Sequence, residues 1–195
     1  LPKRKIILVA DSSYAALELL NSLLKLLEPV YMITPLRLDA ALYEPAPERK
    51  AGTRGRPRKK GKRLPTLNAV LEDPNTHWQR ITVENWYGQG LTEVEMTYGN
   101  AVWYHNGMPV VPIRWILVRD PKAEFRTRAL LCTDQSAEPI QILKWFIRRW
   151  QVEVTFQEVR AHLGVETQRQ WSDNAIARVT PILMALFSVV TLMAQ

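Results

Sequence analysis

The sequence predicts an α/β fold that is interrupted by a β-rich insertion. Three observations support this class: an apolar strand–helix–strand pattern near the N-terminus, a central stretch with period-two alternation, and helical patterns after it. With 195 residues, of which 47% are hydrophobic and 23% charged, the chain has the composition of a globular protein. The single cysteine, Cys132, excludes an internal disulfide, and no apolar run reaches the roughly 18 residues that a membrane span needs.

Residues 5–34 predict a strand–helix–strand unit with parallel strands. The run Lys-Ile-Ile-Leu-Val-Ala at 5–10 is apolar without alternation, which is typical of a strand covered on both faces. A helical pattern begins at Tyr14, after two serines that can cap it, and Pro29 ends it. A second apolar run occupies residues 30–34, so the segment is expected to form one βαβ unit.

The rest of the chain predicts an insertion and a return to the core. The four expected parts are residues 1–45, the first part of the core; 46–66, a basic connector; 67–135, a β-rich insertion; and 136–195, the last helices of the core. In the insertion, apolar and polar residues alternate as in half-buried antiparallel strands, and about four strands are expected. Asn106-Gly107 is a strong signal for a hairpin turn.

Two helices are predicted after the insertion. Ser136 can cap a long helix that continues to about Leu163, and Asp134 is expected to help start it. Residues 175–194 form a last apolar helix, which carries only Arg178 as a charge. This composition predicts that the last helix is buried.

Basic residues are concentrated in one segment, residues 49–63. It holds nine of the 26 Lys and Arg residues and no acid, so that 17 basic and 19 acidic residues remain elsewhere. Such a segment cannot fold alone, and we expect a flexible arm that lies along the phosphate backbone of DNA. The alternative is a solvated loop or a localisation-like run. The predicted DNA-binding residues are Arg49, Lys50, Arg54, Arg56, Arg58, Lys59, Lys60, Lys62 and Arg63.

Asp11 is the first candidate for chemistry. It directly follows the predicted strand at 5–10, and the ligands of open α/β sheets gather at the carboxyl ends of the strands. The alternative is a local cap of the following helix, which the position of Asp11 alone favours.

A second candidate group lies on the predicted long helix. At 3.6 residues per turn, Phe146, Arg149, Glu153 and Arg160 fall within a stripe of about 60° that borders the apolar face. A carboxylate there is expected to be partly buried beside cations, as in a cleft. A surface salt bridge between Arg149 and Glu153 is the alternative, and spacing alone does not decide between the two.

These residues resemble a known signature. The segment FIRRWQVEVTFQEVR (146–160) resembles the Tyr-x2-Arg-x3-Glu-x6-Lys signature of bacterial insertion-sequence transposases of the DDE class, with Phe146 for Tyr and Arg160 for Lys. The segment IILVADSSYA (6–15) resembles the strand that carries their second catalytic aspartate, at Asp11. The resemblance implies an RNase H-like fold, partial because its first strands are missing, with a β-rich insertion before the last catalytic helix.

The resemblance also implies a two-metal phosphoryl-transfer site that uses Mg²⁺, with Mn²⁺ as a substitute. Asp11 and Glu153 are the implied metal ligands, and Arg149 and Arg160 are implied to meet DNA phosphates or to orient Glu153. The implied partner is double-stranded DNA, at transposon ends and targets, bound by a homodimer in the bacterial cytoplasm without a membrane. The family needs a further, first aspartate that no acid of this sequence supplies in the right place, so the chain alone is expected to be inactive.

Two other functions stay open at this point. The chain could be a non-catalytic DNA-binding remnant of a transposase, or an RNase H-like nuclease that hydrolyses DNA without joining strands. The insertion also holds four tryptophans, Trp78, Trp86, Trp103 and Trp115. Most of them are expected to be core residues, although one of them could stack on a DNA base.

Overall fold

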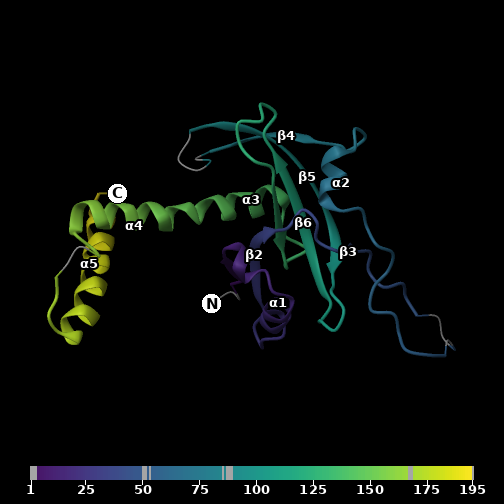
Figure 1. Ribbon diagram of the computed structural model, residues 1–195, viewed down its shortest axis with the longest axis horizontal. Coiled ribbons are helices and arrows are strands. Elements are labelled where there is room, and N and C mark those ends of the chain that lie inside the picture. The colour runs from purple at the N-terminus through teal and green to yellow at the C-terminus, as the bar shows by residue number, and fades with distance from the viewer. Residues whose placement is uncertain are drawn as a thin grey trace. The chain divides into compact units, whose positions relative to one another are not determined.

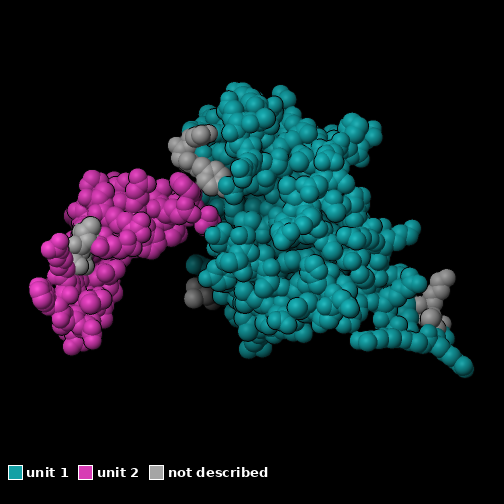
Figure 2. Space-filling view, viewed as in Figure 1, with its two compact units in different colours: residues 1–147 teal, residues 148–195 magenta. Residues whose placement is uncertain are grey.

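The computed structural model describes residues 4–49, 52, 54–84, 86, 90–166 and 169–194. The chain divides into two compact units, Leu1–Ile147 and Arg148–Gln195, which Figure 2 shows in different colours. The first unit contains the sheet and the second unit is helical. The mixed α/β class predicted from the sequence is therefore confirmed, whereas its RNase H-like assignment stays a prediction.

Seven strands of the first unit form one sheet in the order β1-β2-β7-β6-β5-β3, and β4 also pairs with β5 (Figure 1). Only the pair β1–β2 is parallel among the described strand pairs. The strands are β1 (Ile6–Val9), β2 (Val30–Leu36), β3 (Leu42–Tyr43), β4 (Gln79–Val83), β5 (Thr92–Trp103), β6 (Val111–Arg119) and β7 (Arg128–Cys132). The four antiparallel strands predicted between residues 67 and 135 are present as β4 to β7, and they continue the sheet of the βαβ unit.

The βαβ unit forms as predicted, but its helix begins later. Ile6 pairs with Val30 and Val9 with Ile33 in parallel register. Between the strands, a single 3-10 turn at Ser12–Tyr14 (η1) precedes α1 (Leu17–Leu24). The turn forms because the Asp11 carboxylate accepts a hydrogen bond from the backbone N–H of Ser12, so the serines do not cap α1.

Helices cover both faces of the sheet. On one face, Leu17 and Leu20 of α1 pack with Leu67 of α2 (Leu67–Glu72) against the strands. On the other face, Leu143 and Phe146 of α3 (Pro139–Arg148) pack in a second cluster. Successive residues of a strand point to opposite faces of the sheet. Because helices cover both faces, the central strands β2, β7 and β6 carry buried apolar residues on both.

The sheet ends at β1, as its position in the strand order shows. Within the described residues β1 pairs only with β2, and Ile6 and Leu8 are 48% and 43% exposed. Ile6 and Leu8 point to the same face of the sheet, so β1 leaves apolar surface uncovered on that face, and an end strand with such a surface is a hazard for aggregation.

The prediction of one long helix over residues 136–163 is wrong, because this segment forms two helices. α3 ends at Arg148 and α4 (Trp150–Leu163) begins after Arg149, whose own dihedral angles are helical (φ −56°, ψ −33°). α3 also begins later than predicted, at Pro139, a residue that suits a first helical turn because it needs no N–H partner.

The second unit contains α4 and α5 (Asp173–Met193). Gly164 ends α4 in the left-handed conformation (φ 67°), and the Ser172 hydroxyl caps α5 by accepting from the N–H of Ala175. The prediction that the last helix is buried is wrong: none of its described residues is buried, and Leu192 is 71% exposed. One neighbour, α4, cannot cover a helix that is apolar all round.

The expectation that no apolar segment reaches the length of a membrane span does not hold for α5. This helix has 21 residues and is long and apolar enough to cross a membrane, and its most apolar part is not buried. These criteria use length and composition alone, and a single such helix is weak evidence for a span.

Candidate functional site

Asp11 lies where the parallel strand pair ends. Ala10 donates its N–H to the carbonyl of Ile33 (2.9 Å), and the buried Thr34 hydroxyl donates to the carbonyl of Asp11 (2.8 Å). The Asp11 side chain is exposed, and its Oδ1 accepts from the N–H of Ser12 (2.8 Å). In the described part of the chain its Oδ2 has no hydrogen-bond partner. The backbone therefore fixes a carboxylate that keeps one oxygen open to a ligand.

Arg149 and Glu153 form the ion pair that the sequence offered as an alternative. Arg149 Nη1 lies 2.9 Å from Glu153 Oε1, and their side chains are 26% and 43% exposed. Phe146, the first residue of the signature, lies elsewhere: it is buried in the α3 cluster of the first unit. The signature therefore spans the break between α3 and α4, and only Arg149, Glu153 and Arg160 belong to the second unit.

Arg160 is held by a carboxylate that the signature does not contain. Its Nε lies 2.6 Å from Glu166 Oε2, and its Nη2 donates to Glu166 Oε1 at 2.9 Å. The left-handed Gly164 turns the chain back so that Glu166 can reach α4. Glu166 engages Nε and Nη2 only, and the side chain is 53% exposed, so a phosphate contact by Arg160 would have to use the remaining N–H donors or replace the carboxylate.

The carboxylates do not assemble a metal site within one unit. Asp11 belongs to the first unit and Glu153 to the second, and their approach stays a prediction. Across residues 4–49, 52, 54–84, 86, 90–166 and 169–194, no three His, Cys, Asp or Glu side chains gather in a metal-binding group. Asp11 offers the oxygen donor that Mg²⁺ prefers, but a metal pair needs more ligands than one unit supplies. Neither unit taken alone fits the implied two-metal site.

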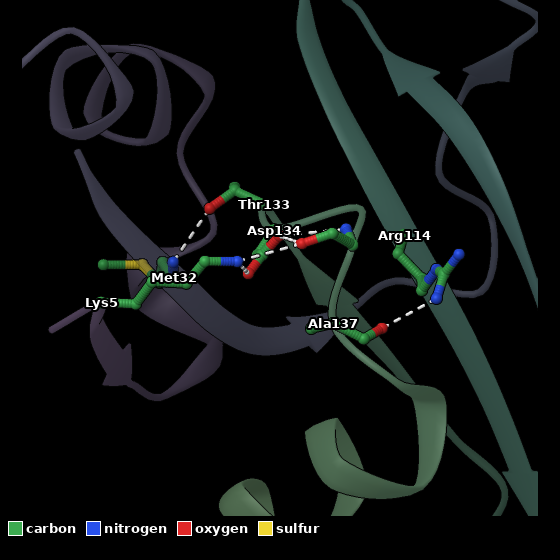
Figure 3. A network of polar contacts seen from close by, with 7 residues as sticks. Lys5, Met32, Arg114, Thr133, Asp134 and Ala137 are labelled. Carbon is green, nitrogen blue, oxygen red and sulfur yellow. Dashed lines mark hydrogen bonds and ion pairs between the residues drawn. The ribbon is translucent and has the colours of Figure 1, made fainter. Parts of the chain in front are cut away.

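Asp134 is the centre of a buried polar network that sequence patterns did not reveal (Figure 3). Its side chain is 7% exposed, and Lys5 Nζ lies 2.8 Å from Oδ2. Ser136 donates to Oδ1 through its N–H (3.0 Å) and its hydroxyl (2.6 Å). Beside it, the hydroxyl of Thr133 accepts from the N–H of Met32 (2.9 Å), which ties the end of β7 to β2. The expectation that Asp134 helps start the helix is wrong: its carboxylate holds the turn at Ser136, three residues before α3 begins at Pro139, and it pairs with Lys5.

The network lies at the opposite end of the strands from Asp11. Cys132 pairs with Ile33 in antiparallel register, so Asp134 follows β7 toward the start of β2, whereas Asp11 follows the end of β1. Four residues of strand correspond to about 13 Å. Asp134 is therefore a structural carboxylate at the other end of the strands from Asp11.

We predict that Asp134→Ala lowers the free energy of unfolding by about 2–3 kcal/mol, because Lys5 and Ser136 both lose their acceptor. Burial alone raises the pKa of Asp134, but the hydrogen bonds from Lys5 and Ser136 outweigh it and lower the pKa below the ordinary 3.8. Its stabilisation is therefore present above about pH 4 and is lost as pH falls through the lowered pKa.

Urea unfolding at a series of pH values tests this prediction. The wild-type protein should lose stability steeply in acid, and Asp134→Asn, which keeps an oxygen for Ser136, should show a shallower loss. Equal pH dependence of the two proteins contradicts a charged Asp134 in the folded state.

The basic segment is anchored at its C-terminal end, and the expectation of a flexible arm is wrong there. The N–H of Glu44 donates to the carbonyl of Lys62 (2.9 Å), and the N–H of Gly61 donates to the carbonyl of Glu44 (2.8 Å). Lys60 Nζ lies over the rings of Tyr43 and Tyr104, 3.4 and 4.7 Å from their centres. The segment is therefore a loop whose base is fixed to β3 and to the turn after β5.

The cations of this loop differ in exposure. Those at 54, 56, 58 and 59 are exposed, as are Arg49, Lys62 and Arg63, whereas Lys60 is half-buried. Lys50 lies outside the described residues. A groove of about 630 Å³ separates residues 56–61 from the β5–β6 hairpin at Tyr104, Asn106 and Gly107. The predicted turn at 106–107 is confirmed, with Gly107 at φ 81°.

Gly61 keeps the loop base closed, and we predict that Gly61→Ala destabilises the protein by about 1–3 kcal/mol. An added Cβ would lie 2.5 Å from the carbonyl oxygen of Pro45 and 2.9 Å from the Cβ of Glu44, so backbone must move. Thermal unfolding measures the loss. Gly90→Ala is the matched control, because nothing lies within 4 Å of its added Cβ. Equal melting temperatures for the two variants contradict a tightly closed base.

The tryptophans of the insertion are mainly core residues, as expected. Trp86 and Trp103 are buried, and Trp78 and Trp115 pack against the same cluster as Trp103. The aromatic side chain that sequence patterns missed is Trp171 of the second unit, which is 99% exposed. Trp171 lies in the loop just before α5, where no periodic pattern of apolar residues predicts whether a side chain is buried or exposed.

A comparison with protein families supports a function at a coarse level. A family model described as DDE superfamily endonuclease matches residues 2–93, just under half of the chain. The match contains Asp11 and the basic loop but not Glu153. It supports a nuclease or transposase of the DDE type that acts on DNA. No curated protein matches the chain.

Proposed function

We propose that this chain is part of a DDE-type DNA transposase that cleaves DNA at the ends of an insertion sequence and joins the ends to a target. The observation that carries the proposal is Asp11: an exposed carboxylate, fixed by its backbone at the end of a parallel strand pair, inside the segment similar to DDE endonucleases. Ligand-binding and catalytic residues of open α/β sheets occupy this position.

The proposal gives the other residues roles that their contacts support. Glu153 is the catalytic glutamate of the signature, and Arg149 positions it through the 2.9 Å ion pair. Arg160 binds a DNA phosphate through its guanidinium, either with the donors that Glu166 leaves open or in place of the Glu166 carboxylate. Asp11 and Glu153 are proposed as ligands of Mg²⁺ or Mn²⁺, which requires the two units to bring them together.

The basic loop supplies the DNA affinity in this proposal. Its cations are mostly exposed, and its base is fixed to the sheet at Gly61 and Lys60. Neutralised phosphates release counterions, so binding by such a loop depends strongly on salt. The partner is double-stranded DNA, and a homodimer in the bacterial cytoplasm is the proposed working form.

A second candidate function is a DNA-binding remnant without catalysis. The observation that favours it is the lack of three gathered acidic or other metal-binding side chains in the described residues. The remnant would use the same basic loop, but Asp11 would serve only to cap the turn at Ser12.

A cleavage and joining assay separates these functions. Purified full-length protein and this chain are incubated with DNA that carries element ends, with Mg²⁺, with Mn²⁺ or with chelator. A transposase nicks the ends with metal and also joins pre-cleaved ends to a target, whereas a nuclease of the RNase H type only hydrolyses. Binding without cleavage by the full-length protein supports the remnant and contradicts the proposal.

A further inference from the structure

Within the basic loop, one short stretch has an unusual composition. Residues 54–58 read Arg-Gly-Arg-Pro-Arg, so that every cation in it is arginine, whereas Lys59, Lys60 and Lys62 follow toward the anchored base. All five residues are exposed and belong to no helix or strand. In Figure 1 this part of the loop extends away from the sheet beyond β3.

We propose that Arg54–Arg58 inserts into the minor groove of AT-rich double-stranded DNA. The inference rests on the proposed function, because it takes duplex DNA as the ligand. It goes beyond that function by naming the groove and the base composition that the chain prefers.

The backbone of this stretch is thin enough for a narrow groove. The minor groove is about 6 Å wide, which excludes an α-helix of about 10 Å but admits an extended chain. Gly55, at φ 98°, has no side chain, and nothing lies within 4 Å of where its Cβ would be. Pro57 prevents helix formation and removes one backbone donor. Gly55 and Pro57, the two residues between the arginines, therefore add no large side chain that would keep the backbone out of the groove.

Arginine suits this groove better than lysine does. AT-rich DNA has a narrow minor groove with an enhanced negative potential that attracts inserted cations. A guanidinium is more weakly hydrated than an ammonium, so the free-energy cost of removing it from water is smaller. At G·C pairs the guanine 2-amino group occupies the floor of the groove, where A·T pairs present only acceptors. Arg54, Arg56 and Arg58 therefore favour AT-rich sites.

The rest of the loop holds this stretch in place. Arg49 Nη2 donates to the carbonyl of Gly55 (3.1 Å), which bridges the two arms of the loop. Lys60 is held by Tyr43 and Tyr104 only two residues after Arg58. A presented, anchored loop loses less conformational freedom on binding than a free tail. Lys59 and Lys62, which follow the arginines and are exposed, are available to meet phosphates beside the groove.

Equilibrium binding to three duplexes of equal length tests the inference: an A·T duplex, a G·C duplex and an inosine–cytosine duplex, which lacks the 2-amino group. We expect at least about tenfold tighter binding to the A·T and inosine duplexes than to the G·C duplex. The charge-matched variant R54K/R56K/R58K should lose this preference but keep the salt dependence of binding, because its net charge is unchanged.

The outcomes separate this inference from the proposed function. Equal affinity for all three duplexes, or a preference that survives in the lysine variant, overturns the minor-groove assignment while DNA binding itself stands. No DNA binding by the wild-type protein overturns both. A preference for A·T that the inosine duplex does not share also overturns the assignment, because the groove floor would then not be what the loop contacts.

Discussion

Asp11→Asn is expected to lower DNA cleavage by the full-length protein at least about a hundredfold, with little change in DNA binding. A carboxylate that holds a catalytic metal contributes several kcal/mol to the transition state, and an amide oxygen without charge replaces it poorly. The folded state should be almost unaffected, because the side chain is exposed and an amide oxygen can still accept from Ser12. Initial cleavage rates and melting temperatures measure the two effects.

Asp73→Asn is the matched control for this substitution. Asp73 is also an exposed carboxylate of the first unit, and its Oδ1 accepts from the N–H of Asn75 (2.9 Å) as Asp11 accepts from Ser12. It follows helix α2 and not a strand of the sheet, so its loss should leave cleavage unchanged. A full rate for Asp11→Asn, or equal losses in both variants, contradicts a catalytic role of Asp11.

Replacing residues 49–59 with a Gly/Ser segment of the same length is expected to weaken DNA binding at all sequences. The replacement removes six cations, Arg49, Lys50, Arg54, Arg56, Arg58 and Lys59, and keeps the anchored residues from Lys60 onward. If six phosphates are neutralised, the slope of log K against log salt is near −5 in the wild-type protein, at about −0.9 per phosphate. The slope should become shallow in the variant.

Fluorescence titration at several salt concentrations gives both slopes. Thermal unfolding provides the control, because the base at Gly61 and the pairing of β3 with β5 should survive the replacement. An unchanged slope and affinity would mean that the loop is only a solvated connection and that DNA is bound elsewhere.

Local patterns predicted the elements whose signals are local. The strands and helix of residues 5–34, the antiparallel strands and the Asn106-Gly107 turn each follow from periodicity or turn chemistry in a short window. Asp11 was found for the same reason, because a polar residue after an apolar run marks the end of a strand. Such signals need no knowledge of what the chain touches elsewhere.

The features that sequence patterns missed depend on distant partners. Lys5 and Asp134 are 129 positions apart, and no local pattern links them. The loop base closes through Glu44 and Gly61, which are ordinary residues when considered alone. The break at Arg149 has no glycine or proline to mark it. The apolar composition of α5 predicted a buried helix. Whether other parts of the chain pack against it depends on tertiary contacts, and the described chain leaves it exposed.

DDE-type chemistry by this chain requires that Asp11 and Glu153 approach each other, because the two carboxylates must share a metal pair. The most direct measurement is the separation of their carboxylates in the full-length protein bound to element-end DNA and Ca²⁺, determined by crystallography or electron microscopy. We predict a separation within about 10 Å, which is close enough for both carboxylates to bind one metal pair. Carboxylates on opposite faces of the sheet, with DNA bound, would contradict it.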